Sequence, residues 1–155
     1  MAGGLLAGCG FKLRGEQNFG FETISVLAPQ GGAVAADLRR ALGERVREPA
    51  AGQVAGPKHV TMDILNEQRE KTVVGVNASG QVREFQLRIR VRFRLRGAAG
   101  RELIADTEIL QQRDISFNES AVLAKEAEEG LLYRDMQNDI VQQLMRRLAA
   151  VQSVP

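Results

Sequence analysis

Side chains that catalyse reactions or bind metal ions are scarce in this sequence. Its 155 residues include one cysteine, one histidine and no tryptophan. The histidine, His59, has no second histidine with which to share a metal, and no cluster of His, Asp and Glu has metal-ligand spacing. A lone histidine beside the start of a strand is expected to be a surface or helix-packing residue. We therefore predict that the protein is not an enzyme and holds no metal.

Long apolar runs are also missing. After Cys9, no stretch approaches the roughly 20 apolar residues of a membrane-spanning helix. Hydrophobic residues make up 44% of the chain and charged residues 26%, which is typical of a globular protein. The length suffices for one core but not for two, so residues 21–155 are predicted to form a single globular domain.

The only cysteine lies in the run Leu6-Ala7-Gly8-Cys9-Gly10, which has the pattern of a lipobox. Small residues give a lipoprotein signal peptidase access to an extended backbone, and the thiol accepts a diacylglyceryl group. On this interpretation residues 1–8 are a signal-peptide remnant and residues 9–20 are a lipidated tether. The alternative is an inert, buried thiol. The covalent lipid on Cys9 is the only cofactor-like group expected.

The sequence pattern of the first half of the domain predicts one helix and two or three strands. Residues 21–28 contain alternating β-branched side chains and favour a strand. Apolar residues from Val34 to Val46 recur at helical spacing, which predicts a helix of about four turns. Residues 48–58, with two prolines, are expected to be a loop. Extended segments at 60–64 and 72–76 are then joined through a bulge in one long strand or separated by a break.

The clearest segment runs from Phe85 to Arg96, where apolar residues alternate strictly with polar ones, five of them arginines. A period of two predicts a strand with one apolar face and one arginine face. A partner strand is expected from about Glu102 to Arg113. The register that keeps acidic residues off the apolar face pairs Arg96 with Glu102. The other pairs expected from it are Arg92–Asp106, Arg90–Glu108, Leu95–Leu103, Phe93–Ala105 and Ile89–Ile109.

This register leaves Arg94 opposite Ile104 and Arg88 opposite Leu110, so both lack an acidic neighbour across the hairpin. With Arg83 they are the predicted free cations. They either form a solvated face or contact an anion or a partner.

From Glu119 to Val151 the pattern is helical, with Asn118 or Ser120 as a cap. One apolar stripe is expected to face the core: it starts with Leu123, Ala127 and Leu131 and is continued by Met136 or Ile140, Val141, Leu144 and Leu148. The expected fold is of the α/β type, an α+β two-layer sandwich with a four-stranded mixed sheet, two helices packed on one face and a bare arginine face.

Four segments, in order along the chain, resemble a known family. They are Cys9–Arg14 behind the lipobox, Gly80–Leu87, Leu123–Glu126 and Asp139–Leu148. Together they are similar to the lipopolysaccharide-assembly lipoprotein LptE family, also called rare lipoprotein B. The resemblance implies a non-enzymatic outer-membrane lipoprotein that sits as a plug in the LptD β-barrel, on the periplasmic side and in the barrel lumen. It also implies help in barrel assembly and binding of lipopolysaccharide.

The resemblance also suggests binding residues. Lys125 matches the basic residue of the family's Leu-Ala-Lys segment and is a candidate lipopolysaccharide contact, with a solvated helix surface as the alternative. The turn at residues 77–79 lacks the cation that the family pattern leads us to expect, so Arg83 or Arg88 would substitute for it. Phosphates on lipopolysaccharide suit such side chains, because arginine and lysine bind them through charge-assisted hydrogen bonds.

Two other functions compete with this hypothesis. A lipid-anchored periplasmic adaptor would use the arginine face to hold an acidic protein or a cell-wall strand. A nucleic-acid-binding module is disfavoured, because the apolar residues between the arginines face the core and an exported lipoprotein meets no nucleic acid.

Overall fold

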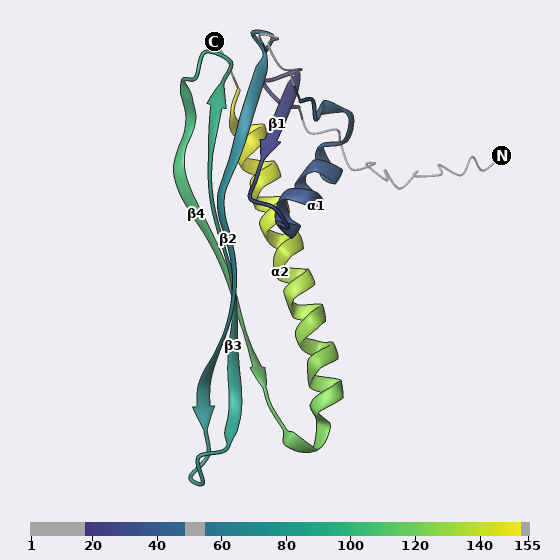
Figure 1. Ribbon diagram of the computed structural model, residues 1–155, viewed down its shortest axis with the longest axis vertical. Helices are drawn as coiled ribbons and strands as arrows, with labels where there is room; N and C mark the ends of the chain where they lie inside the picture. Colours follow the sequence, from purple (N-terminus) through teal and green to yellow (C-terminus); the bar gives the residue numbers. More distant parts are fainter. Residues whose placement is uncertain (1–17, 49–54, 153–155) are drawn as a thin grey trace, which may run out of the picture.

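The computed structural model describes residues 18–48 and 55–152. Cys9 and most of the predicted tether lie outside these ranges. The described chain forms a long, twisted sheet of four strands in the order β1-β2-β3-β4, with both helices on one face (Figure 1). Strand β1 is parallel to β2, and the other neighbours are antiparallel. The elements are β1 (Thr23–Leu27), α1 (Ala33–Leu42), β2 (His59–Val76), β3 (Val82–Gly97), β4 (Glu102–Ser116) and α2 (Val122–Ala150).

The α+β two-layer sandwich predicted from the sequence is therefore confirmed. The molecule has two different ends (Figure 1). At the proximal end, β1 and α1 join the sheet and the end of α2. At the distal end, only β2, β3 and β4 lie beside the beginning of α2, and the β2–β3 turn projects beyond the helix. No helix among the described residues is both long and apolar enough to cross a membrane.

Helix α1 is shorter than predicted. Its α-helical part ends at Leu42, and a 3-10 turn continues from Gly43 to Arg45. Gly43 has a φ of 57°, a conformation that glycine adopts readily at the end of a helix. The helix begins after Gly32, which has no side chain to cap it. The carboxylate of Glu67 on β2 replaces the cap and accepts hydrogen bonds from the first two backbone N–H groups.

Strand β2 is continuous over 18 residues, so of the two alternatives the long bulged strand is correct. Ile64 pairs with Phe93 and Asn66 with Arg92, which leaves Leu65 as the extra residue. A bulge of one residue exchanges the two faces of a strand. Inward positions are therefore even-numbered before Leu65 and odd-numbered from Glu67 to Val73, where the next irregularity begins.

The hairpin register predicted for β3 and β4 is right at Arg96–Glu102 and wrong beyond it. Two irregularities insert two additional residues into β4 before residue 107. The observed pairs include Leu95–Ile104, Phe93–Thr107, Arg92–Glu108, Arg90–Leu110, Ile89–Gln111 and Arg88–Gln112. Because the total shift is two residues, the apolar and charged faces stay as predicted even though the partners change.

Only the second half of α2 is buried in the core. Met136, Ile140, Val141, Leu144 and Leu148 are buried, as predicted. The prediction is wrong for the first part of the stripe: Ala127 is exposed, and Leu123 and Leu131 are 82% and 57% exposed. Neither β1 nor α1 reaches the distal end, so no layer formed by residues 18–48 and 55–152 covers this side of the helix (Figure 1).

Candidate functional site

The open face of the sheet, opposite the helices, is lined with arginines, and most of them form ion pairs with acidic side chains of the same face. Asp63 of β2 is 8% exposed and accepts hydrogen bonds from Arg94 (2.8 Å) and from Arg96 (2.7 and 2.9 Å). Burial alone would raise the pKa of Asp63, but the hydrogen bonds from Arg96 and Arg94 outweigh it and lower the pKa below its ordinary value. The prediction that Arg94 is a free cation is therefore wrong.

Two further arginines on this face form the ion pairs expected from the sequence, although not directly across the strands. Arg92 pairs with Asp106, and Arg90 lies 3.9 Å from Glu108. The register places both contacts diagonally. Arg88 differs from these, because its Nε donates to Gln86 (2.7 Å) and it forms no ion pair with the described residues. Acidic side chains thus neutralise most of the open face, and Arg88 has Glu70 opposite it in the β2–β3 register without forming an ion pair.

A small hollow of about 250 Å³ lies at the distal end between α2 and the sheet. Its apolar floor includes Phe85 and Phe117, whose rings meet edge to face at 5.3 Å. Lys71 lies over the Phe85 ring, with Nζ 4.3 Å from its centre, and pairs with Glu129 at 2.6 Å. We call this the distal hollow.

Lys125 lines the distal hollow from α2. Its ammonium group donates to Ser116 at 2.9 Å and to Glu128 at 2.8 Å, and its side chain is only 21% exposed. An apolar floor beside two ammonium groups can hold an anionic amphiphile, although the carboxylates of Glu126 and Glu129 also line the hollow and balance its charge. Because both lysines already have glutamate partners, such a ligand would have to replace Glu128 or Glu129.

The structure does not bring the three predicted binding residues together. Lys125 is on the helix side of the sheet, whereas Arg88 alternates with buried Leu87 and so lies on the open face. Arg83 is exposed near the β2–β3 turn, where its guanidinium donates to Gln81 at 3.2 Å. Lys125 alone belongs to a hollow.

The sequence did not identify Lys71 and Phe85 as residues of the distal hollow. Lys71 lay in a polar stretch that the pattern marked as a bend, and Phe85 was assigned only to the core. Their register partners explain the arrangement: Lys71 pairs with Leu87, and Phe85 pairs with Val73, all on the helix face of the sheet. Placing these two residues together requires the pairing register of β2 with β3. The alternation of polar and apolar residues within one segment does not give that register.

The prediction for His59 is wrong, because it is 4% exposed and packed between strands. Its Nε2 is 3.0 Å from the hydroxyl of Ser25, which itself donates to the Arg47 carbonyl at 2.7 Å. Nε2 therefore donates to Ser25, and Nδ1 accepts from Thr23 at 2.9 Å. Burial lowers the pKa of His59, which favours the neutral ring. The Ser25 hydroxyl already donates its hydrogen bond to the Arg47 carbonyl. The hydrogen bonds of His59 with Thr23 and Ser25 therefore connect β2 to β1.

No group of three or more potential metal ligands occurs among residues 18–48 and 55–152. Two helices on one face of a mixed sheet, with charged hollows beside the longer helix, define a small α+β domain suited to binding.

Comparisons with known proteins identify the family. The solution NMR structure of lipoprotein B from Nitrosomonas europaea is 38% identical to this chain, covers 92% of both chains and has a TM-score of 0.73. The family model described as LptE, lipopolysaccharide-assembly, matches residues 21–148. The chain therefore belongs to the LptE family of lipopolysaccharide-assembly lipoproteins.

More distant structures share the fold. The crystal structure of rare lipoprotein B from Shewanella oneidensis is 19% identical, with a TM-score of 0.68 over 84% of this chain and 96% of that chain. A minor lipoprotein from Acinetobacter baumannii is 17% identical, with a TM-score of 0.65 over 86% of this chain and 94% of that chain. The comparison with curated proteins gave no match.

Proposed function

We propose that this chain is an outer-membrane lipoprotein, lipidated on Cys9, that acts with an LptD-type β-barrel in lipopolysaccharide transport and assembly. The match of the LptE family model over residues 21–148 carries this proposal. In it, the protein serves as a plug, assists assembly of the barrel and binds lipopolysaccharide from the periplasmic side and the barrel lumen.

The open sheet face supports a place inside a barrel. Barrel interiors are polar, and a surface whose arginines are mostly paired with Asp63, Asp106 and Glu108 can lie against such a wall with few unpaired charges. The exception is Arg90 Nε, which is buried 3.9 Å from Glu108 without a hydrogen-bond partner. A layer of unpaired arginines would instead require an acidic partner. The observed pairing therefore favours the barrel over the alternative of an adaptor for an acidic protein.

The distal hollow supports lipopolysaccharide binding at Lys125. A phosphate can replace Glu128 as partner of the ammonium group, while acyl methylenes cover Phe85 and Phe117. Arg83 and Arg88 remain candidates for further phosphate contacts, each in a different place on the surface.

The proposal is tested by purifying the tagged lipoprotein from its own outer membranes in mild detergent and identifying the proteins that accompany it. A large β-barrel protein in equal amount is the expected result. Recovery of the lipoprotein alone, or with a soluble periplasmic protein, would overturn the barrel partnership. The peptide that begins at Cys9 should carry added fatty-acid mass in the wild type and none in Cys9→Ser, and a wild-type peptide without that mass would refute lipidation.

Ligand binding is tested separately with Lys125→Gln. Lipopolysaccharide should bind this variant several-fold more weakly than the wild type. Lys58→Gln is the matched control, because Lys58 is also paired with a glutamate, Glu22 at 3.1 Å, but lies near the proximal end. Equal affinities of the two variants would remove Lys125 from the binding site.

A further inference from the structure

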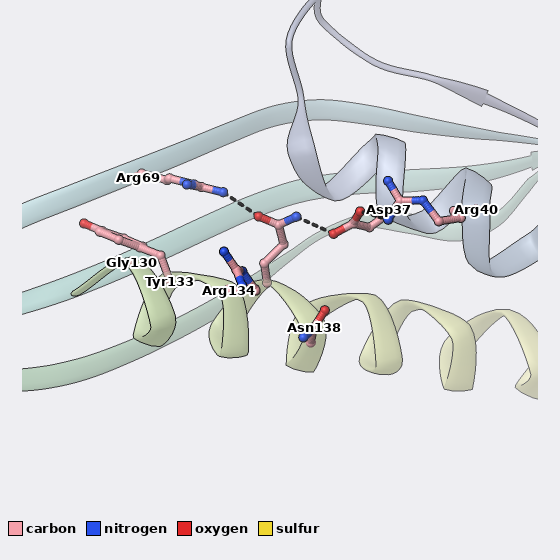
Figure 2. Close-up of a pocket in the computed structure, with 8 residues that line it drawn as sticks. Asp37, Arg40, Arg69, Gly130, Tyr133, Arg134 and Asn138 are labelled. Atoms are coloured by element: carbon pink, nitrogen blue, oxygen red, sulfur yellow. Dashed lines mark hydrogen bonds and ion pairs between the residues drawn. The ribbon is translucent and has the colours of Figure 1, made fainter. Parts of the chain in front are cut away.

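A second, larger hollow lies between α1 and α2, separate from the distal hollow. It has a volume of about 450 Å³. Figure 2 shows residues that line it. Asp37 and Arg40 line it from α1, Arg69 from β2, and Tyr133 and Arg134 from α2. We call it the interhelical hollow.

Charges in the interhelical hollow are unbalanced. Three guanidinium groups line it, those of Arg40, Arg69 and Arg134, against the single carboxylate of Asp37. Arg40 pairs with Asp37 at 2.6 Å. Arg134 forms no ion pair or side-chain hydrogen bond with any residue that the structure describes. Each arginine carries five N–H donors, so most of the donors around this hollow remain available.

The walls of the hollow are connected by a chain of side-chain hydrogen bonds. Arg69 donates to the side-chain oxygen of Gln137, and the Gln137 amide donates to Asp37. The Arg69 guanidinium also lies 5.4 Å from the centre of the Tyr133 ring, and the Tyr133 hydroxyl donates to the Glu70 carbonyl at 2.9 Å. This chain links β2, α2 and α1. Arg69 is therefore held in position before any ligand arrives, which reduces the entropy lost on binding.

We propose that the interhelical hollow binds a phosphate group through Arg40, Arg69 and Arg134. Planar guanidinium groups match phosphate oxygens with paired hydrogen bonds, and an excess of positive charge favours a multiply charged anion over a carboxylate. The hollow is open, and Arg40, Arg69 and Arg134 are exposed, so it suits a phosphate carried on a larger molecule.

The inference deepens the proposed function and rests on it only for the source of the phosphate. Arg69 in the interhelical hollow and Lys71 in the distal hollow are two residues apart on the same face of β2, about 7 Å along the strand. A glycolipid with several phosphates, such as lipopolysaccharide, can therefore contact the distal and the interhelical hollow together. Free phosphate or another phosphate ester is the competing source.

The test follows the arginine side-chain Nε–Hε resonances of the ¹⁵N-labelled full chain in detergent. Inorganic phosphate is the probe, and sodium chloride at the same ionic strength controls for screening. The resonances of Arg69 and Arg134 should shift saturably with phosphate but not with chloride. Arg134→Gln should weaken phosphate binding about tenfold. Arg101→Gln removes an exposed arginine from the β3–β4 turn and should leave it unchanged.

Lipopolysaccharide and its dephosphorylated form then separate the possible sources. If Arg134→Gln weakens binding of the phosphorylated form alone, the glycolipid is the ligand. If it weakens inorganic phosphate but not lipopolysaccharide, the site stands with a different phosphate source. Equal shifts with chloride, or equal losses in Arg134→Gln and Arg101→Gln, would overturn the site. Lipopolysaccharide binding that responds to Lys125→Gln but not to Arg134→Gln, without saturable phosphate shifts, would refute this inference and leave the proposed function intact.

Discussion

Replacing Asp63 by asparagine should destabilise the fold more than any other charge removal on the open face. Asp63 accepts three hydrogen bonds from Arg94 and Arg96, and its side chain is 11% exposed. Asparagine has nearly the same volume but no charge. Its amide nitrogen is a donor, so it would face a guanidinium that needs an acceptor.

The magnitude follows from the exposure of the three partners. Breaking a fully buried ion pair costs about 3–5 kcal/mol. Here the Arg94 and Arg96 side chains are 41% and 34% exposed and regain water when Asp63 is lost. That screening reduces the expected loss to about 2 kcal/mol. For a chain of this length, the corresponding decrease in Tm is about 4–8 °C.

Urea unfolding followed by far-UV circular dichroism measures this loss, since the chain has no tryptophan for fluorescence. Glu102→Gln is the matched control: Glu102 lies opposite Arg96 in the register but forms no ion pair with it. Its change should stay below about 0.5 kcal/mol. A small effect of Asp63→Asn beside a large effect of Glu102→Gln would refute the assignment of Asp63 as the partner of Arg96.

The stabilisation by Asp63 should also depend on pH in a definite direction. The pKa of Asp63 is lowered in the folded protein, so its stabilisation is present above its ordinary value near 3.8 and is lost as the pH falls through the lowered pKa. The difference in unfolding free energy between wild type and Asp63→Asn should therefore shrink in strong acid. A difference that grows there would contradict the reasoning.

Three further predictions concern the helix side of the sheet. Glu67→Ala removes the carboxylate that caps α1 and should cost about 1–2 kcal/mol in urea unfolding; an unchanged midpoint would show that solvent caps the helix equally well. His59 has a lowered pKa in the folded state, so unfolding free energy should fall as the pH decreases below 6.5, and this fall should be weaker in His59→Gln; equal slopes would exclude His59 as the cause. Gln137→Leu cuts the link between Arg69 and Asp37 and should cost about 1 kcal/mol by the same assay, whereas a stabilised variant would mean that burial of the leucine outweighs the link.

Strict alternation made β3 predictable, because any other conformation would place its arginines in the core. The register with β4 was predictable only as far as the first irregularity. Bulges are set by local backbone geometry and leave no trace in a polar–apolar pattern when two of them restore the original faces. The pairs Arg92–Asp106 and Arg90–Glu108 formed nevertheless, because long side chains reach diagonal neighbours.

The first turns of α2 show a different limit. Leu123, Ala127 and Leu131 do recur at helical spacing, but periodicity records only that a helix has an apolar stripe. Whether another layer covers that stripe depends on how far β1 and α1 extend, and both end within the proximal half (Figure 1). The candidate hollows were hidden for a related reason, since each combines side chains from elements far apart in the sequence.

The single inserted residue Leu65 determines which β2 side chains cap α1 and line the two hollows. Because it exchanges the faces of β2, the next three inward side chains are Glu67, Arg69 and Lys71 rather than their even-numbered neighbours. Glu67 caps α1, Arg69 enters the interhelical hollow, and Lys71 enters the distal hollow. A strand without the bulge would turn all three charges toward the open face and Gln68 and Glu70 toward the helices. The bulge therefore places a carboxylate at a helix N-terminus and two cations in the hollows, as the proposed binding of an anionic glycolipid along α2 requires.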